Sequence, residues 1–210
     1  QREFNTHLLG DSGITFEELE AKGYHAVNPD PVPAGRPVAT PTGKIELYST
    51  ILEELGLDPL PGYKAPEREA QPADVRARYP LTLITGDRER SYHHSRFHDQ
   101  AWARKVSPDP RLVMHPETAA GLGFADGEWV MLEVAGANGK CRLRLKLSDA
   151  TPRDVVNTGM GWWRPEAAAP DRGALDVNIN AALAYAGPYD PVSGSSDIRG
   201  QLCRVEAERE

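Results

Sequence analysis

The stretch EWVMLEVAGANGKCRLRLKL, residues 128–147, decides the fold predicted for this chain. Apolar and polar residues alternate along both of its halves, as in a strand with one buried face. The residues expected to face inward are Val130, Leu132, Val134, Cys141, Leu143, Leu145 and Leu147. The turn at 136–139 contains Asn-Gly, a favoured hairpin dipeptide. The sequence therefore predicts an antiparallel hairpin that contributes one face to a core.

Further short strands are expected on both sides of this hairpin. Residues 81–84 form an apolar strand through Leu81, Leu83 and Ile84, and residues 155–157 and 202–205 are also strand candidates. Short strands separated by glycine turns favour a closed barrel, because closure leaves no unpaired edge. We therefore expect residues 79–210 to form a mainly β domain with short helices, an α+β fold built on a small β-barrel.

Residues 1–78 are expected to form an extended, partly helical segment. Thr15 and Glu18 make a capping box at the start of one short helix, which Gly23 ends. Ser49 caps a second helix, which Gly56 ends. The proline-rich stretch 28–33, and the prolines, glycines and charges of 58–78, predict extended chain. Two short helices on such linkers bury little, so we expect them to pack against another part of a larger enzyme.

Composition excludes several functions. The chain has 210 residues, enough for one large domain, and its net charge of −7 argues against nucleic-acid binding. No stretch approaches the roughly 18 apolar residues of a membrane span, so this segment should make no membrane contact. Without a signal pattern at its start, the sequence leaves a cytoplasmic or periplasmic location open. Cys141 and Cys203 are expected to be buried, inert thiols.

A polar loop follows the first strand, in YPLTLITGDRERSYHHSR, residues 79–96. Gly86 would let a ligand approach the backbone, while the arginines and histidines supply hydrogen-bond donors. Many α/β proteins hold a phosphorylated or heterocyclic cofactor in this way. An ordinary polar surface loop is the alternative.

The order of motifs from Tyr79 onward resembles the C-terminal cofactor-binding domain of the molybdopterin oxidoreductases. This is the dimethyl sulfoxide reductase family, which carries a bis-molybdopterin guanine dinucleotide. The motifs are the 79–96 loop, HPETAAGLGFADG at 115–127, the hairpin, GWWRPE at 161–166, NIN at 178–180 and DPVSG at 190–194. The stretch ATPTGKIELYS at 39–49 also resembles the segment that leads into this domain. The resemblance implies a double-psi, aspartate-decarboxylase-like β-barrel.

The same resemblance implies that the chain is the C-terminal part of a molybdenum or tungsten oxidoreductase and binds one pterin dinucleotide. An iron–sulfur cluster and a protein ligand of the metal are expected elsewhere in the enzyme. The implied partners are the other domains, an electron-transfer subunit and a small-molecule substrate. This part is not expected to be catalytic alone, because the metal-ligating and cluster-binding parts are expected elsewhere. No residue in it stands out as a general base or nucleophile.

The resemblance also selects candidate cofactor-binding residues. They are Thr85, Gly86, Asp87, Arg88, Tyr92, His93, His94, Ser95, Trp163, Asn178, Asn180 and Arg199. Many family members have arginine where this chain has Asp87, so Arg88 or Arg90 is expected to supply the positive charge.

Asn178 and Asn180 alternate with apolar residues, which predicts both amides on one side of an extended segment. A turn-forming asparagine pair is the alternative. The Trp162–Trp163 pair suggests stacking on a flat ligand, with core filling as the alternative.

His93, His94 and His98 are clustered, but the glutamate of an HExxH motif is absent and no metal site is expected.

Two other functions remain open on the sequence. One is a non-catalytic double-psi barrel that recognises a partner or serves as a small cofactor-binding subunit. It would not need the long segment 1–78. The other is a barrel decarboxylase, which would require a Gly-Ser self-cleavage step that this chain does not offer near a plausible base.

Overall fold

The computed structural model describes residues 2–25, 35–60, 62, 71–185, 189–196 and 198–208. They belong to two units, Gln1–Tyr63 and Lys64–Glu210. The proline-rich stretch 28–33, predicted to be extended, lies outside the described residues, as do residues 63–70 of the stretch 58–78. The prediction of extended chain for 58–78 is wrong at its end, because Ala73–Arg78 is helical. Within the described ranges, no helix has the length and apolar character needed to cross a membrane.

The first unit contains short helices with little buried surface. They are α1 (Arg2–Leu9), the 3-10 turn η1 (Gly10–Ser12), α2 (Phe16–Lys22) and α3 (Thr50–Glu54). The predicted capping box is confirmed: the Thr15 hydroxyl accepts from the Glu18 amide at 3.2 Å, and Glu18 accepts from the Thr15 amide at 3.0 Å. Ser49 caps α3, as predicted, by accepting from the Leu52 amide at 3.3 Å. None of these helices contains a buried residue.

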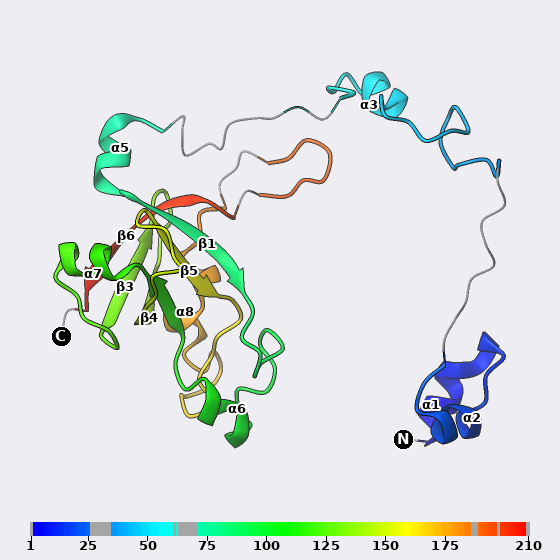
Figure 1. Cartoon of the computed structure of the whole chain (residues 1–210), viewed down its shortest axis with the longest axis horizontal. Coiled ribbons are helices and arrows are strands. Elements are labelled where there is room, and N and C mark those ends of the chain that lie inside the picture. Colours follow the sequence, from blue (N-terminus) through cyan, green and yellow to red (C-terminus); the bar gives the residue numbers. More distant parts are fainter. Residues whose placement is uncertain are drawn as a thin grey trace. The chain divides into compact units, whose positions relative to one another are not determined.

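The second unit is a six-stranded closed barrel with short helices around it (Figure 1). Its elements are α5 (Ala73–Arg78), β1 (Leu81–Asp87), α6 (Ala101–Val106), β2 (Arg111–Met114), α7 (Pro116–Leu122), β3 (Trp129–Val134), β4 (Lys140–Leu147), β5 (Val155–Gly159), α8 (Ala174–Val177), the 3-10 turn η2 (Ile179–Ala182) and β6 (Gln201–Ala207). The strand order around the barrel is β1-β5-β2-β4-β3-β6. The predicted barrel is confirmed, and its topology is consistent with a double-psi barrel.

The predicted hairpin forms the centre of the core. Val130 on β3 pairs with Leu143 on β4, and all of the inward residues of both strands except Leu145 and Leu147 have no exposed surface. Leu145 is 3% exposed, and Leu147 is partly buried against the cluster. Alternation therefore identified the buried face of this hairpin correctly.

The inward face of β1 differs from the prediction at one residue. Leu81 and Leu83 are buried, but Ile84 is 43% exposed. Thr85 takes the inward position instead, and its hydroxyl donates to the Ile198 carbonyl at 3.2 Å. Strict alternation puts residues 81, 83 and 85 on one face, so Ile84 faces outward although it is apolar.

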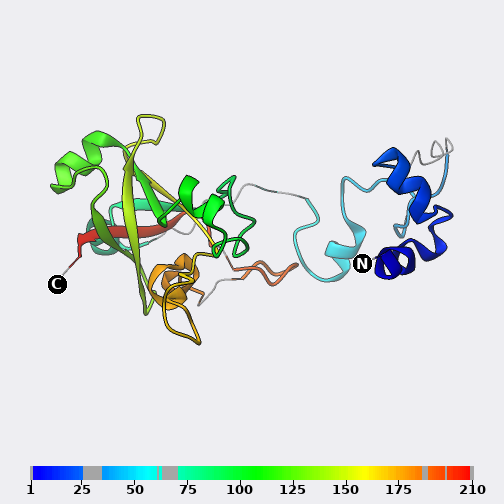
Figure 2. The same ribbon diagram turned by 90° about the horizontal axis from the view of Figure 1, so that it is seen from below.

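The loops after β1 and β5 leave the barrel at the same end, as Figures 1 and 2 show. This follows from the parallel pairing of the two strands, in which Thr82 pairs with Val155 and Thr85 with Thr158. The register shifts between Thr85 and Asp87, so Gly86 is the extra residue of a β-bulge. Segments about 70 residues apart in the sequence are thereby brought together.

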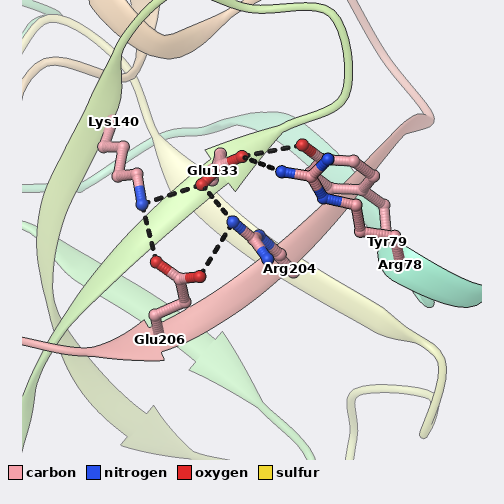
Figure 3. A network of polar contacts seen from close by, with 6 residues as sticks. All are labelled: Arg78, Tyr79, Glu133, Lys140, Arg204 and Glu206. Atoms are coloured by element: carbon pink, nitrogen blue, oxygen red, sulfur yellow. Dashed lines mark hydrogen bonds and ion pairs between the residues drawn. The ribbon is translucent and has the colours of Figure 1, made fainter. Parts of the chain in front are cut away.

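A polar network on the outside of the barrel joins β3, β4 and β6 (Figure 3). The Glu133 carboxylate on β3 accepts from the Tyr79 hydroxyl at 2.7 Å and lies 2.8 Å from both Lys140 Nζ and Arg204 NH2. Glu206 on β6 bonds the same two cations at 2.6 and 2.9 Å. The hydrogen bond from Lys140 is the largest influence on the pKa of Glu133, which falls to about 2 although burial opposes the change.

Candidate functional site

The loop that follows β1 begins at a glycine in a left-handed conformation. Gly86 has a φ of +97°, and a Cβ added there would lie 3.6 Å from Met160 Cε and 3.9 Å from a guanidinium nitrogen of Arg199. Gly86 and Arg199, two predicted site residues, are therefore close together at this end of the barrel. Side chains with a Cβ rarely adopt this backbone conformation.

An aromatic cluster lies between the loops after β1 and β5. Tyr92 stacks on His98, with ring centroids 4.1 Å apart and an angle of 8° between the planes. Trp162 meets both rings edge-on, at 5.2 Å from Tyr92 and 4.7 Å from His98. The Tyr92 hydroxyl donates to the Ser107 carbonyl, at the end of α6. The rings are buried, with Trp162 only 2% exposed, so they join the two loops into one structure.

The two loops also touch through their backbones. A Cβ on Gly161 would lie 2.9 Å from the His94 carbonyl carbon and 2.9 Å from the Ser95 nitrogen, so only glycine fits there. Next to it, the Trp163 indole nitrogen donates to the Ser95 carbonyl at 2.6 Å. The GWWRPE motif therefore packs directly against the histidine pair.

Two clefts share Trp162 as a lining residue. The first cleft encloses about 430 Å³ of space, including the part open to solvent, and its lining residues are Asp87, Arg88, Glu89, Tyr92, His93, His94, Met160 and Trp162. The second cleft encloses about 580 Å³ on the same measure, and its lining residues are Ser95, Gly161, Trp162, Trp163, Pro170, Asp171, Arg172, Ala174 and Asn178.

Most of the predicted site residues line these clefts. Five are in the first cleft and three in the second: Asp87, Arg88, Tyr92, His93 and His94, then Ser95, Trp163 and Asn178. Gly86 and Arg199 lie beside Met160, which lines the first cleft. Thr85 points into the barrel and is 4% exposed, and the exposed Asn180 lines neither cleft.

The predicted extended segment at the asparagine pair is wrong. α8 ends at Val177, Asn178 alone is extended, and Ile179–Ala182 forms the 3-10 turn η2. The Asn178 side chain caps this turn by accepting from the Asn180 amide at 3.1 Å. The local hydrogen bond favours the turn over a strand, so the two amides do not share a face.

The negative charge of Glu89, which lines the first cleft, is balanced by Arg111. The Glu89 carboxylate accepts from Arg111 Nε at 2.8 Å and from the Ser107 hydroxyl at 2.6 Å. Burial alone would raise the pKa of Glu89, but these hydrogen bonds outweigh it and hold the pKa below its ordinary value. Because Arg111 offsets the Glu89 charge, the remaining Asp and Arg side chains that line this cleft are Asp87 and Arg88, one carboxylate and one guanidinium.

Sequence reasoning missed several lining residues. Glu89 and Met160 were not singled out, Trp162 was passed over for Trp163, and Asp171 and Arg172 lie in a stretch without a motif. The GWWRPE motif was the available signal for Trp162. Among the described residues, no group of three or more His, Cys, Asp and Glu side chains is arranged to hold a metal ion.

Comparison with known proteins gives one family. The family model described as the molydopterin dinucleotide binding domain matches residues 81–201, more than half of the chain. Acetylene hydratase of Syntrophotalea acetylenica is 35% identical over 95% of this chain and 28% of its own length. The solved structure of acetylene hydratase from Pelobacter acetylenicus superposes with a TM-score of 0.82 at 34% identity, over 95% of this chain and 28% of that one.

Two further relatives extend the comparison. Dopamine dehydroxylase of Eggerthella lenta is 34% identical over 79% of this chain and 16% of its own length. A dimethyl sulfoxide/trimethylamine N-oxide reductase of Rhodobacter capsulatus is 28% identical over 84% of this chain and 21% of its own length. The chain thus spans between 16% and 28% of the length of these relatives.

Proposed function

Because this chain belongs to the molybdopterin oxidoreductases and contains their dinucleotide-binding domain, we propose that its two clefts bind one pterin dinucleotide of a molybdenum or tungsten enzyme. The bound form would be one half of a bis-molybdopterin guanine dinucleotide. The observation that supports this proposal is the meeting of three separate parts of the chain around Trp162: the loops after β1 and β5, and the segment at Asn178.

The residues in the clefts suit such a ligand. A pterin dinucleotide has flat rings, phosphates and many hydrogen-bonding atoms. Arg88, His93 and His94 offer donors in the first cleft, and Arg172 and Asn178 offer polar groups in the second. Trp162, which lines both clefts, contributes apolar surface to each.

Each part of this end of the barrel would then have a separate role. The Arg88 guanidinium would attract and orient phosphate oxygens, because it stays charged and presents a planar set of donors. Trp162 and Trp163 would exclude water from the ligand's rings. When bound, the metal–pterin group would supply the redox or oxygen-atom chemistry, while this chain contributes binding and orientation.

The relatives are several times longer than this chain, so we propose that other parts of the enzyme complete its activity. These parts would supply the protein ligand of the metal, an iron–sulfur cluster, the substrate pocket and the contacts with an electron-transfer subunit. In this arrangement the chain is a cofactor-holding domain within an oxidoreductase.

Replacing Gly86 with valine in the whole enzyme tests the proposal. The variant must place a β-branched residue at a φ of +97°, which should displace Asp87 and Arg88 from the first cleft. Metal and guanine content per polypeptide, measured after purification by mass spectrometry and by nucleotide release, should fall severalfold.

Gly123→Val is the matched control. Gly123 also has a left-handed φ, +80°, but it ends α7, has no atom within 4 Å of an added Cβ and lines neither cleft. Its variant should keep the wild-type metal and guanine content. Equal content in both variants would remove the loop after β1 from the binding site, and a wild-type enzyme without metal or guanine would favour a non-catalytic barrel module.

A further inference from the structure

The turn that presents the histidine pair is strained. His94 has a φ of +56°, in the left-handed region that residues other than glycine seldom occupy. The side chains of His93 and His94 are exposed and line the first cleft. A strained conformation persists only where surrounding contacts hold it, and such sites are frequently functional.

Successive carbonyl groups of this turn are each held by a different donor. The bonds are Arg96 N to His93 O at 3.1 Å, His98 Nε2 to His94 O at 3.1 Å and Trp163 Nε1 to Ser95 O at 2.6 Å. The bond from Arg96 lies within the turn, and the bond from Trp163 comes from the loop after β5. The bond from His98 comes from a buried side chain of the loop after β1, and it holds the carbonyl of His94, the strained residue.

The geometry determines the tautomer of His98. A carbonyl oxygen can only accept, so Nε2 must carry the proton and Nδ1 must be the bare nitrogen. His98 is 1% exposed, and within the part of the chain that the structure describes its Nδ1 has no hydrogen-bond partner. Burial is the main cause that lowers the pKa of His98, which favours the uncharged ring.

Packing alone does not account for a histidine at this position. The ring stacks on Tyr92 and meets Trp162 edge-on, contacts that a phenylalanine ring could make without burying an unpaired nitrogen. What phenylalanine lacks is the donor to the His94 carbonyl. The donor is therefore the property that distinguishes histidine from an apolar ring here.

We propose that His98 is a positioning residue: its Nε2–H holds the strained His94 turn, so that both exposed histidines face the first cleft in the orientation that binds the cofactor. The proposal deepens the proposed function, since it names a residue that touches neither cleft but controls one of them. It does not require His98 to contact the ligand.

Two substitutions separate the donor from the ring. His98→Phe keeps the stack on Tyr92 and loses the donor, whereas His98→Gln loses the ring and can place an amide donor near the position of Nε2. In the 210-residue chain, NMR gives the exchange rate of the Arg96 amide, whose bond to His93 closes the turn. The Ala119 amide, bonded to His115 O in α7 at 3.0 Å, is the internal reference.

We expect His98→Phe to speed Arg96 exchange about fivefold relative to Ala119, the factor produced by losing one typical hydrogen bond. His98→Gln should stay within about twofold of wild type. In the wild-type chain, the imidazole ¹⁵N shifts should identify the Nε2–H tautomer of His98. Unchanged exchange in His98→Phe, or equal acceleration in both variants, would overturn the proposal.

The whole enzyme then connects the turn to the cofactor. Its guanine and metal content should fall in His98→Phe and recover in His98→Gln. If the exchange rates behave as expected but the content of His98→Phe equals that of wild type, the turn is not part of cofactor binding and the proposal is wrong. A wild-type enzyme that carries no pterin would refute the proposed function instead, while the exchange rates would still decide whether His98 holds the turn.

Discussion

Glu133→Gln should destabilise the barrel in a pH-dependent way, because this residue is the centre of the network in Figure 3. Its carboxylate accepts from the Tyr79 hydroxyl and pairs with Lys140 and Arg204, so it links Tyr79, two residues before β1, to β4 and β6. Glutamine keeps the size of the side chain and one acceptor oxygen. The substitution therefore removes mainly the charge.

The pKa of Glu133 limits the size of the effect. Its fall from an ordinary 4.5 to about 2 corresponds, at about 1.36 kcal/mol per pKa unit, to at most about 3.4 kcal/mol. The Glu133 side chain is 13% exposed, but that of Lys140 is 42% exposed, so solvent screens part of the attraction. We expect a loss of about 1–2 kcal/mol in the free energy of unfolding at neutral pH.

The sign of the pH dependence follows from the direction of the pKa change. The folded state lowers the pKa, so the stabilisation is fully present above the unfolded value near 4.5 and is lost as the pH falls towards 2. The difference between wild type and variant should therefore be widest above about pH 6 and almost vanish near pH 2.

Urea unfolding followed by tryptophan fluorescence is a suitable assay. All four tryptophans, at 102, 129, 162 and 163, lie in the Lys64–Glu210 unit, so their emission reports on the barrel alone. Glu117→Gln is the control, because its pair with Arg153 is 66% exposed on both sides, so solvent screens it and its loss should change stability far less. A wild-type–variant difference that stays constant from pH 7 to pH 3, or that does not exceed the control, would refute the reasoning.

Two further predictions concern the core and its turns. Gly139→Ala should cost about 2–3 kcal/mol in urea unfolding, because its Cβ would lie 2.3 Å from the Ala181 carbonyl oxygen, whereas Gly121→Ala has no atom within 4 Å and should not destabilise. Equal midpoints for these two variants would show that the hairpin turn and η2 can separate freely. Burial raises the pKa of Cys203 to about 12 and that of Cys141 further above its ordinary range, so neither thiol should react with a disulfide reagent at pH 8 until urea is added. Rapid labelling of the native chain would contradict this burial.

Some site residues could be predicted because they are neighbours in the sequence. The loop after β1 could be selected from sequence because Gly86, the arginines and the histidines are adjacent in the chain and follow a strand. The structure brings most of the selected residues to two neighbouring clefts. Their contact with a cofactor stays a prediction.

The sequence by itself determined the features that depend on nearby residues. Alternation over 128–147 identified the hairpin and its buried face, and side-chain caps identified the starts of α2 and α3. These signals are local because a strand has a period of two and a cap acts within four residues. The order of motifs then indicated the family.

Only the tertiary structure decided what depends on pairing between distant segments. The parallel pairing of β1 with β5 brings Gly161 against His94 and makes Trp162 part of the lining of both clefts. The same closure gives the β2 strand, only four residues long, partners on both sides. No local period specifies such neighbours, because they are set by which strands pair when the barrel closes.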